Sequence, residues 1–178
     1  MEALSGPVYL AGLLLALGGA AKALRPVPTA GALRALHLPG PRSGVRALGA
    51  LEVVLGLAAV LSGARFLLVA VGCFYVAFAI FVLVALRSGT ALQTCGCFGS
   101  VDTPPSMIHV GLDAVLAAAC LAAGAVGLPN ARTLLADQPW SGVPMVLGLV
   151  VGLYLAYLLL TALPTTLEAA RVQAELRS

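Results

Sequence analysis

Five long apolar runs, separated by short polar segments, divide the chain. They cover residues 7–24, 45–61, 66–86, 107–128 and 143–163. A helix needs about 20 apolar residues to cross the hydrocarbon core of a bilayer, and about 17 suffice as a minimum. Because lipid offers no hydrogen-bond partner for open backbone groups, each run is expected to be helical. The pattern therefore predicts an all-α bundle of five transmembrane helices that forms one domain over residues 1–178.

The second run is the weakest of the five, because it is short and Glu52 interrupts it. In an alternative arrangement of four spans, residues 45–61 lie in the membrane interface, and every later segment changes side. A tight turn, Ser62–Gly63–Ala64–Arg65, joins this run to the third. We expect five spans, with the second and third joined as a helical hairpin.

The two ends of the chain flank these spans. The first ten residues, MEALSGPVYL, contain Glu2 and no Lys or Arg, whereas a secretory signal has a basic leader. The first run is therefore predicted to be retained as a span. The tail, residues 165–178, is predicted to continue the fifth helix into water, with Thr165 or Thr166 able to cap a separate short helix.

The composition agrees with a membrane protein. Hydrophobic residues make up 61% of the chain and charged residues only 10%, whereas a soluble domain is about half apolar and about a quarter charged. The sequence contains no phosphate-binding loop, no serine nucleophile motif and no haem-attachment motif. It also lacks a face of interleaved basic and aromatic residues, so we expect no nucleic-acid partner.

Lys and Arg residues concentrate on one side of the predicted bundle. Five spans place the first polar segment, the segment before the fourth span and the C-terminus on the same side. That side has eight of the ten basic residues: Lys22, Arg25, Arg34, Arg42, Arg46, Arg87, Arg171 and Arg177. The other side has Arg65 and Arg132. Because an excess of Lys and Arg marks cytoplasmic segments, the N-terminus is predicted outside and the segment before the fourth span in the cytoplasm.

That segment, ALQTCGCFGSVDTPPSMIH at residues 91–109, contains two of the four cysteines. Cys95 and Cys97 flank Gly96, which gives the backbone freedom for a tight loop. A disulfide across one residue closes a small ring, and strained, exposed disulfides are the labile, catalytic or regulatory kind. The pair is therefore a candidate for thiol–disulfide exchange. The alternative is that two small residues in a loop happen to be cysteine.

The residues after the cysteines resemble a helix start. Asp102 or Thr103 can cap a helix, and Pro104 or Pro105 suits its first turn. The positive end of such a helix, placed near the thiols, favours the thiolate and hence exchange.

Four ionisable side chains are predicted to meet beneath the cysteine loop. Glu52 lies about two turns inside the second span, and Lys22 closes the first span at the same end. His109 and Asp113 are four residues apart, so they share one face of the fourth helix near that end. Ionisable groups inside a membrane are costly and by default indicate function.

These four residues have a functional and a structural interpretation. In the functional one, Cys95, Cys97, His109 and Asp113 are catalytic: His109, oriented by Asp113, takes the proton from a cysteine. Lys22 and Glu52 then support the site as a buried pair or a proton path. In the structural one, the same side chains pin the helices together, since a buried charge persists only when it is paired.

The other two cysteines, Cys73 and Cys120, lie at similar depth in the third and fourth spans. Equal depth allows a second thiol pair across the membrane from the first, if those helices pack side by side. The alternative is that both are small apolar fillers, since free cysteine is commonly buried.

The stretch Cys95–Gly96–Cys97–Phe98–Gly99, before the penultimate span, resembles the MauE (methylamine utilisation) family, within the broader DoxX-like membrane proteins. Lys22 closing the first span and Glu52 in the second also fit that pattern. The resemblance covers most of the chain in layout, but only the C-x-C-F-G stretch is specific. It implies a redox-associated protein of the bacterial inner membrane, a thiol–disulfide oxidoreductase that supports disulfide formation or transfer in exported proteins. In that reading Cys95 and Cys97 exchange with a thioredoxin-like partner.

The predicted orientation conflicts with the usual place of disulfides, which persist outside the cytoplasm. Either electrons cross the membrane, with the inner pair exchanging with a cytoplasmic thioredoxin, or the second run does not cross.

Three other functions are consistent with the same residues. Two thiolates one residue apart suit Cu(I), Hg(II) or Zn(II), and His109 is able to complete such a soft-metal site with Cys95 and Cys97. In the second, the chain is a non-catalytic membrane subunit that docks a thioredoxin-like enzyme. In the third, the chain is a quinone-linked oxidase, because a sequence does not distinguish a quinone groove from ordinary helix packing.

Overall fold

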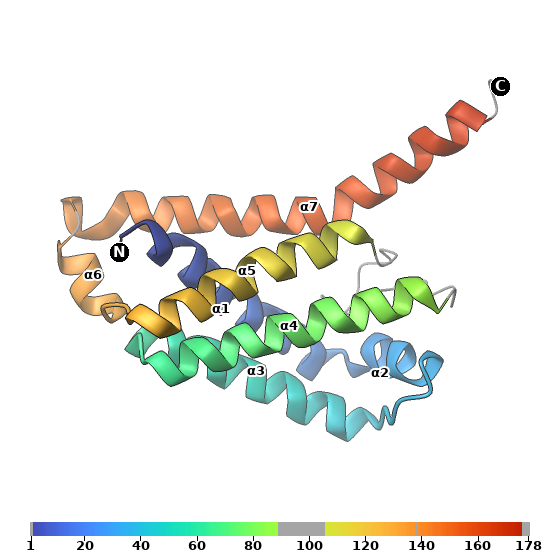
Figure 1. Cartoon of the computed structure of the whole chain (residues 1–178), viewed down its shortest axis with the longest axis horizontal. Helices are drawn as coiled ribbons and strands as arrows, with labels where there is room; N and C mark the ends of the chain where they lie inside the picture. The colour runs from blue at the N-terminus through green and yellow to red at the C-terminus, as the bar shows by residue number, and fades with distance from the viewer. Residues whose placement is uncertain (1, 89–105, 138, 176–178) are drawn as a thin grey trace.

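The computed structural model describes residues 2–88, 106–137 and 139–175, and over these residues all regular secondary structure is helical, with no strand. The helices are α1 (Glu2–Leu24), α2 (Pro26–Ala35), α3 (Arg42–Ser62), α4 (Arg65–Arg87), α5 (Met107–Val126), α6 (Ala131–Asp137), the short 3₁₀ helix η1 (Pro139–Gly142) and α7 (Val143–Glu175). Figure 1 shows α1, α3, α4, α5 and the first part of α7 side by side along one long axis. The predicted all-α bundle is confirmed.

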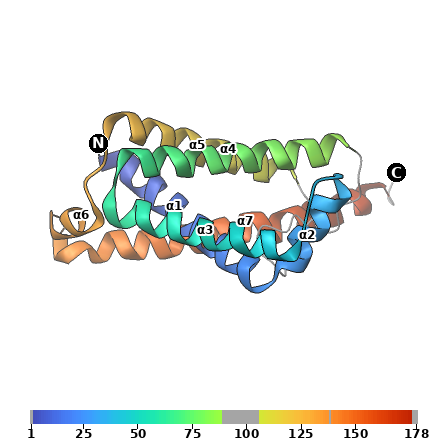
Figure 2. The same cartoon turned by 90° about the horizontal axis from the view of Figure 1, so that it is seen from below.

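Five of these helices are long and apolar enough to cross a membrane. The qualifying stretches are Leu4–Leu24, Arg42–Ser62, Arg65–Arg87, Met107–Val126 and Val143–Leu160. They agree with the five predicted spans to within a few residues. The helix α3, which the four-span alternative placed flat in the interface, runs along the bundle beside α1 (Figures 1 and 2). Over the described residues the structure therefore has five candidate membrane-spanning helices, as the sequence predicted.

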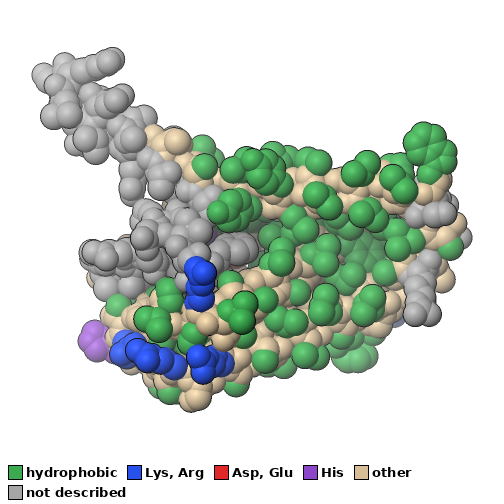
Figure 3. All heavy atoms as spheres, turned by 180° about the vertical axis from the view of Figure 1, so that it is seen from behind, with side chains coloured by type: hydrophobic (Ala, Val, Ile, Leu, Met, Phe, Trp, Pro, Cys, Tyr) green, Lys and Arg blue, Asp and Glu red, His purple; other side chains and the backbone are tan. Residues whose placement is uncertain are grey.

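The helices alternate in direction, so the two ends of the bundle differ. One end has the last turns of α1 and α4, the helix α2, the first turn of α5 and the C-terminal part of α7 (Figure 1). The other end has the N-terminus, the turn between α3 and α4, and α6. Hydrophobic side chains cover the length of the helices, and the Lys and Arg side chains visible in Figure 3 gather at the α2 end. The outer surface therefore suits lipid along its length and water at that end.

The hairpin between α3 and α4 forms as the sequence predicted. Helix α3 ends at Gly63, which adopts a left-handed conformation with φ 64°, and α4 begins at Arg65. Two features exclude a side chain at this position. One is the positive φ angle, and the other is the Leu128 carbonyl oxygen, which lies 2.7 Å from where a Cβ atom would be. Glycine at this position ends the helix and lets the chain reverse.

Three short elements were not predicted. Helix α2 occupies the first polar segment, where Pro26 stands at the first helical position, a place that suits proline. Helix α6 begins after Asn130, whose side-chain oxygen accepts a hydrogen bond from the Thr133 backbone N–H at 2.9 Å. Together with η1, these elements connect the spans without crossing the bundle.

Helix α7 continues without interruption to Glu175, which agrees with the predicted extension of the fifth span. It changes direction near its C-terminal third (Figure 1), and Pro164 lies inside it. A proline inside a helix removes one backbone hydrogen bond and bends the axis. The Thr166 hydroxyl donates to the Leu163 carbonyl oxygen at 2.9 Å, so it braces this bend and does not cap a separate helix.

Helices α1 and α3 approach each other closely through paired glycines. A Cβ atom placed on Gly19 would lie 2.5 Å from the Gly49 carbonyl oxygen, and one on Gly49 would lie 2.5 Å from the Gly19 carbonyl oxygen. Gly12 and Gly56 meet in the same reciprocal way two turns further along. Small residues at such contacts let the backbones of membrane helices pack directly against each other.

We predict that Gly19→Ala destabilises the bundle by about 1–3 kcal/mol, because the added methyl group forces α1 and α3 apart. The measurement is denaturant unfolding of the purified protein in detergent. Gly111→Ala is the matched control, since a Cβ atom there meets nothing within 4 Å. The control is expected to leave stability unchanged or raise it by up to about 1 kcal/mol. Equal effects of the two substitutions would contradict the close contact.

Candidate functional site

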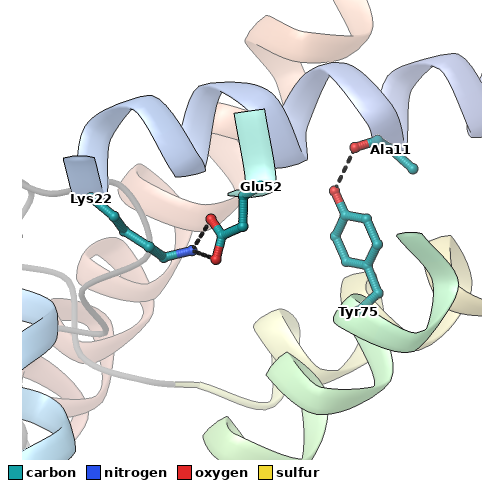
Figure 4. A network of polar contacts seen from close by, with 4 residues as sticks. All are labelled: Ala11, Lys22, Glu52 and Tyr75. Carbon is teal, nitrogen blue, oxygen red and sulfur yellow. Dashed lines mark hydrogen bonds and ion pairs between the residues drawn. The ribbon is translucent and has the colours of Figure 1, made fainter. Parts of the chain in front are cut away.

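A buried ion pair joins α1 to α3 at the α2 end of the bundle. Lys22 Nζ donates to both carboxylate oxygens of Glu52, at 2.9 Å to Oε1 and 2.7 Å to Oε2 (Figure 4). Glu52 is 0% exposed and Lys22 only 6% exposed. A charge buried this deeply is stable only with a close partner, so each residue explains the presence of the other.

The local geometry of the two helices makes this pair. Side chains on an α-helix lean toward its N-terminus, so the long Lys22 side chain extends back along α1 toward the level of Gly19. Glu52 lies opposite, with its Cβ only 2.7 Å from where a Cβ on Gly19 would be. The absence of a side chain at Gly19 therefore leaves the space in which the ion pair forms.

Helix α4 contributes two aromatic rings to this region. The Lys22 ammonium lies 4.5 Å from the centroid of the Phe78 ring, a cation–π contact. The Tyr75 hydroxyl donates to the Ala11 carbonyl oxygen at 2.8 Å, which ties α4 to α1 (Figure 4). The two rings also pack edge to face, with their centroids 6.0 Å apart. Phe78 and Tyr75 thus fix the position of α4 against the ion pair.

His109 stands in the first turn of α5 and is buried, with 5% of its surface exposed. Its Nδ1 lies 2.9 Å from the Ser106 hydroxyl oxygen. Ser106 occupies the cap position of α5, and its side chain bonds this ring instead of a backbone N–H. Within the described residues the histidine Nε2 has no hydrogen-bond partner. Among the described residues, the ring is thus held through Nδ1.

One cavity of ≈ 50 Å³ brings these groups together. Its walls include Lys22 and Glu52 from one side, and His109 and Asp113 from the other. Tyr75 and Phe78 also line it. The sequence predicted that the four ionisable residues meet at similar depth, and in the structure all four border the same space. That space is large enough for a few water molecules.

The cavity joins acidic, basic and imidazole groups in an otherwise apolar bundle, which is an arrangement suited to moving protons. The histidine Nδ1 shares a hydrogen bond with the Ser106 hydroxyl. The orientation of His109 by Asp113 stays a prediction. Asp113 lines the same cavity and contributes a second carboxyl group there.

The cysteines fall into two groups. Cys95 and Cys97 lie outside the described residues, as do Asp102, Thr103, Pro104 and Pro105 of the expected helix start. Cys73 and Cys120 are both free: Cys73 is exposed on α4, and Cys120 is completely buried in the core. The structure therefore does not join Cys73 and Cys120 as a disulfide, and the second thiol pair stays a prediction.

In the part of the chain that the structure describes, no three His, Cys, Asp or Glu side chains are grouped to hold a metal ion. The soft-metal alternative depends on Cys95 and Cys97 together with His109, so it extends beyond those residues.

Sequence reasoning did not identify Ser106, Tyr75 or Phe78 as parts of this region. A signal for Ser106 was present, since serine three residues before His109 is within hydrogen-bonding reach at a helix start. The aromatic residues gave no such signal, because tyrosine and phenylalanine in an apolar span are ordinary packing residues.

Comparison with known proteins gives one match. The family model described as "Methylamine utilisation protein MauE" matches residues 3–129, which include α1 to α5. The matched range contains Lys22, Glu52, His109 and Asp113. No curated protein and no solved structure matches the chain. The wider DoxX-like relation stays a prediction.

We predict that Lys22→Met alone destabilises the protein by about 3–5 kcal/mol, because it leaves the Glu52 carboxylate buried without its partner. The double variant Lys22→Met/Glu52→Gln removes both charges and is expected to recover most of that loss. Denaturant unfolding of the purified variants in detergent, arranged as a double-mutant cycle, measures the coupling. Additive losses in the double variant would show that the two side chains do not form a pair.

Proposed function

Because the chain belongs to the MauE family, a group of membrane proteins named for methylamine utilisation, we propose that it contributes thiol–disulfide exchange to such a process. In this proposal Cys95 and Cys97 exchange electrons with a thioredoxin-like partner, in support of disulfide formation or transfer in exported proteins. The polar cavity at the α2 end supplies the proton chemistry.

One observation carries the proposal. The cavity bordered by Lys22, Glu52, His109 and Asp113 lies at the end of the bundle where α4 finishes at Arg87 and α5 begins at Met107. The segment that contains both cysteines starts and ends at that same end of the bundle. Exchange of a thiol pair needs groups that accept and return protons, and the only described histidine inside the bundle borders this cavity.

Thiol–disulfide exchange between the partner and the Cys95–Cys97 pair takes place in two steps. A thiolate of the reduced partner attacks one sulfur of the Cys95–Cys97 disulfide, which forms a mixed disulfide and releases the other cysteine as a thiolate. The second partner thiolate then attacks the mixed disulfide, which leaves the partner oxidised and both cysteines reduced. Two electrons and two protons pass from the partner to the cysteine pair, and the reverse reaction uses the same steps.

In this scheme His109 gives a proton to the leaving cysteine thiolate or takes one from the attacking thiol. The Ser106 hydroxyl fixes the ring through Nδ1, and Asp113, on the same cavity wall, stabilises the ring when it is protonated. Lys22 and Glu52 support the site by holding α1 and α3 together beneath it.

We predict that the purified full-length protein oxidises a reduced thioredoxin, and that Cys95→Ser and Cys97→Ser each abolish turnover. The mixed disulfide with thioredoxin is expected to accumulate in one of the two single variants and to be visible by mass spectrometry. Cys73→Ser/Cys120→Ser is the matched control and is expected to retain the rate. Loss of exchange in this control with full activity in Cys95→Ser would overturn the assignment.

The role of His109 has its own readout in the same assay. His109→Gln keeps the size and polarity of the ring but removes its titration, so the exchange rate is expected to fall about 100-fold. The slope of the rate against pH below neutrality should also disappear. If His109 were merely structural, its replacement would lower the melting temperature of the protein and leave the pH profile of the remaining activity unchanged.

We also propose that the α2 end faces the cytoplasm. Eight of the ten Lys and Arg residues belong to that end by sequence, and the side chains of Arg25, Arg34, Arg42, Arg46 and Arg87 are exposed there. Such an excess of basic residues is typical of cytoplasmic segments. In this orientation the partner of Cys95 and Cys97 is a cytoplasmic thioredoxin, the N-terminus lies outside, and electrons cross the membrane between that thioredoxin and exported proteins.

We predict that a membrane-impermeant maleimide labels Cys95 and Cys97 in inverted vesicles only after reduction, in a Cys73→Ala/Cys120→Ala background. Intact cells are the matched comparison and are expected to show no labelling. Labelling of intact cells after reduction would reverse the orientation. Labelling on either face without reductant would instead favour metal binding or docking, because both cysteines would then be free thiols.

A further inference from the structure

Exposed basic side chains gather at the α2 end of the bundle (Figure 3). Those in α2, in the first turns of α3 and beside the last turns of α1 and α4 are Arg25, Arg34, Arg42, Arg46 and Arg87. Among the side chains that the structure describes, the only acidic ones are Glu52 and Asp113, and both line the inner cavity. No described acid therefore neutralises the positive charge of this surface.

Contacts between α2 and the segment before α3 bring three of these arginines together. Arg34 Nε donates to the Ala30 carbonyl oxygen at 3.0 Å. The same oxygen lies 2.8 Å from where a Cβ atom on Gly40 would be, so the Arg34 side chain and the Gly40 backbone lie against one atom. Arg42 follows Gly40 by two residues, and Arg46 is one turn further along the same face of α3. We call Arg34, Arg42 and Arg46 the arginine cluster.

The guanidinium groups of the arginine cluster are available to a ligand. With the other described residues, Arg42 and Arg46 form no hydrogen bond or ion pair. Arg34 uses its Nε for the Ala30 carbonyl oxygen, which fixes the side chain and leaves its terminal N–H groups. A guanidinium is a planar fork of N–H donors that matches the oxygens of a phosphate better than a lysine ammonium does. The chemistry of the cluster therefore suits a phosphate group.

Helix α2 has one buried and one exposed face, as helices in a membrane interface do. On the buried face, Ala32 packs against Ala85 of α4. The exposed face has Val27, Gly31 and Arg34. A face that combines an apolar side chain with an arginine suits the boundary between acyl chains and head groups.

The arginine cluster lies at the level where lipid head groups begin. Arg42 starts the candidate membrane-spanning stretch Arg42–Ser62. Arginines at the ends of membrane helices extend toward the head groups, while their aliphatic stems lie along apolar surface. Leu24 and Leu38, which flank α2 in the sequence, are exposed, and such side chains suit contact with acyl chains. These surroundings favour a phosphate that is attached to a lipid.

We propose that the arginine cluster binds the head group of an anionic phospholipid, with the phosphate at Arg34, Arg42 and Arg46 and the acyl chains directed toward the hydrocarbon. Anionic lipids attract basic segments at a membrane surface. A soluble acidic partner would match the charge of the cluster but not the exposed leucines beside it. The site is independent of thiol exchange, because it includes no cysteine and no residue of the polar cavity.

The test uses one tryptophan reporter at each end of the bundle. Trp140, the only tryptophan of the chain, is exposed in η1 at the end opposite α2. Val27→Trp in a Trp140→Phe background moves the reporter to the exposed face of α2. The purified full-length protein is placed in vesicles of phosphatidylglycerol and phosphatidylcholine, one of the two with brominated chains, which quench tryptophan on contact. We expect at least about tenfold preference for phosphatidylglycerol at the α2 reporter and less than about twofold at Trp140.

Removal of the three charges tests which residues are responsible. Arg34→Gln/Arg42→Gln/Arg46→Gln, made in the α2-reporter protein, is expected to reduce the preference to less than about twofold. Arg65→Gln is the control at the opposite end, where Arg65 is also exposed, and it is expected to leave the preference unchanged.

A second pair of variants leaves all the arginines in place. A Cβ atom on Gly31 would meet no atom within 4 Å, so the fold accommodates both Gly31→Glu and Gly31→Gln. The glutamate carboxylate would lie three residues before Arg34 and compete with the phosphate for it. We expect Gly31→Glu to reduce the preference at least about threefold, and Gly31→Gln, of the same size, to leave it unchanged.

Four outcomes would overturn the inference. Equal preference at the two reporters would show that anionic lipid has no site at the α2 end. A preference that survives in the triple variant, with its unfolding midpoint retained, would place the lipid elsewhere. Equal effects of Gly31→Glu and Gly31→Gln would exclude charge as the cause. Loss of the preference on addition of inorganic phosphate, at an ionic strength matched with sodium chloride, would assign the cluster to a soluble anion.

Discussion

The contact between Lys22 and Glu52 sets the main constraint on this bundle. A charge in the apolar part of a membrane costs several kcal/mol unless another charge lies beside it, so α1 and α3 have to stay close enough for two oxygens to reach one ammonium. The Gly19–Gly49 contact provides that closeness, because neither residue has a side chain to separate the backbones. Phe78 then covers the ammonium from α4. Three helices are thus positioned by one ion pair.

The four ionisable cavity residues and the apolar core occupy different parts of the bundle. Lys22, Glu52, His109 and Asp113 lie at the α2 end, whereas the opposite half of α1 packs through Ala11 and Val8 in the apolar core. Helix α5 connects the two environments, since His109 stands in its first turn and Cys120 is buried in the core about three turns beyond. The four ionisable residues that line the cavity therefore lie close to the helix termini between which Cys95 and Cys97 lie in the sequence.

The sequence predicted much of this arrangement, for reasons that particular residues make clear. The five spans follow from apolar length, and alternation of direction alone brings Lys22, Glu52, His109 and Asp113 to a common depth. Helices α2 and α6 were missed, because each is short and depends on caps such as Pro26 and Asn130 instead of on apolar periodicity. The bond between Ser106 and His109 was missed although both residues lie at the start of α5, because a serine at that position usually caps a backbone N–H. The apolar groove at Gly148, between α1, α5 and α7, was missed because it depends on how far apart helices lie, and apolar patterns do not encode that distance.

Glycine has two opposite effects in the same fold, and the difference lies in how tightly the helices pack. At Gly19 and Gly49 the missing side chain brings two helices into contact and excludes everything else. At Gly148 it leaves a gap that no atom of the described residues fills, so α7 packs more loosely against the bundle there. The ion pair does not depend on that looser contact, because Lys22 and Glu52 lie between α1 and α3 and Phe78 of α4 covers the ammonium. Close glycine contacts are therefore found where two charges have to stay paired, and open glycines where no buried charge needs covering.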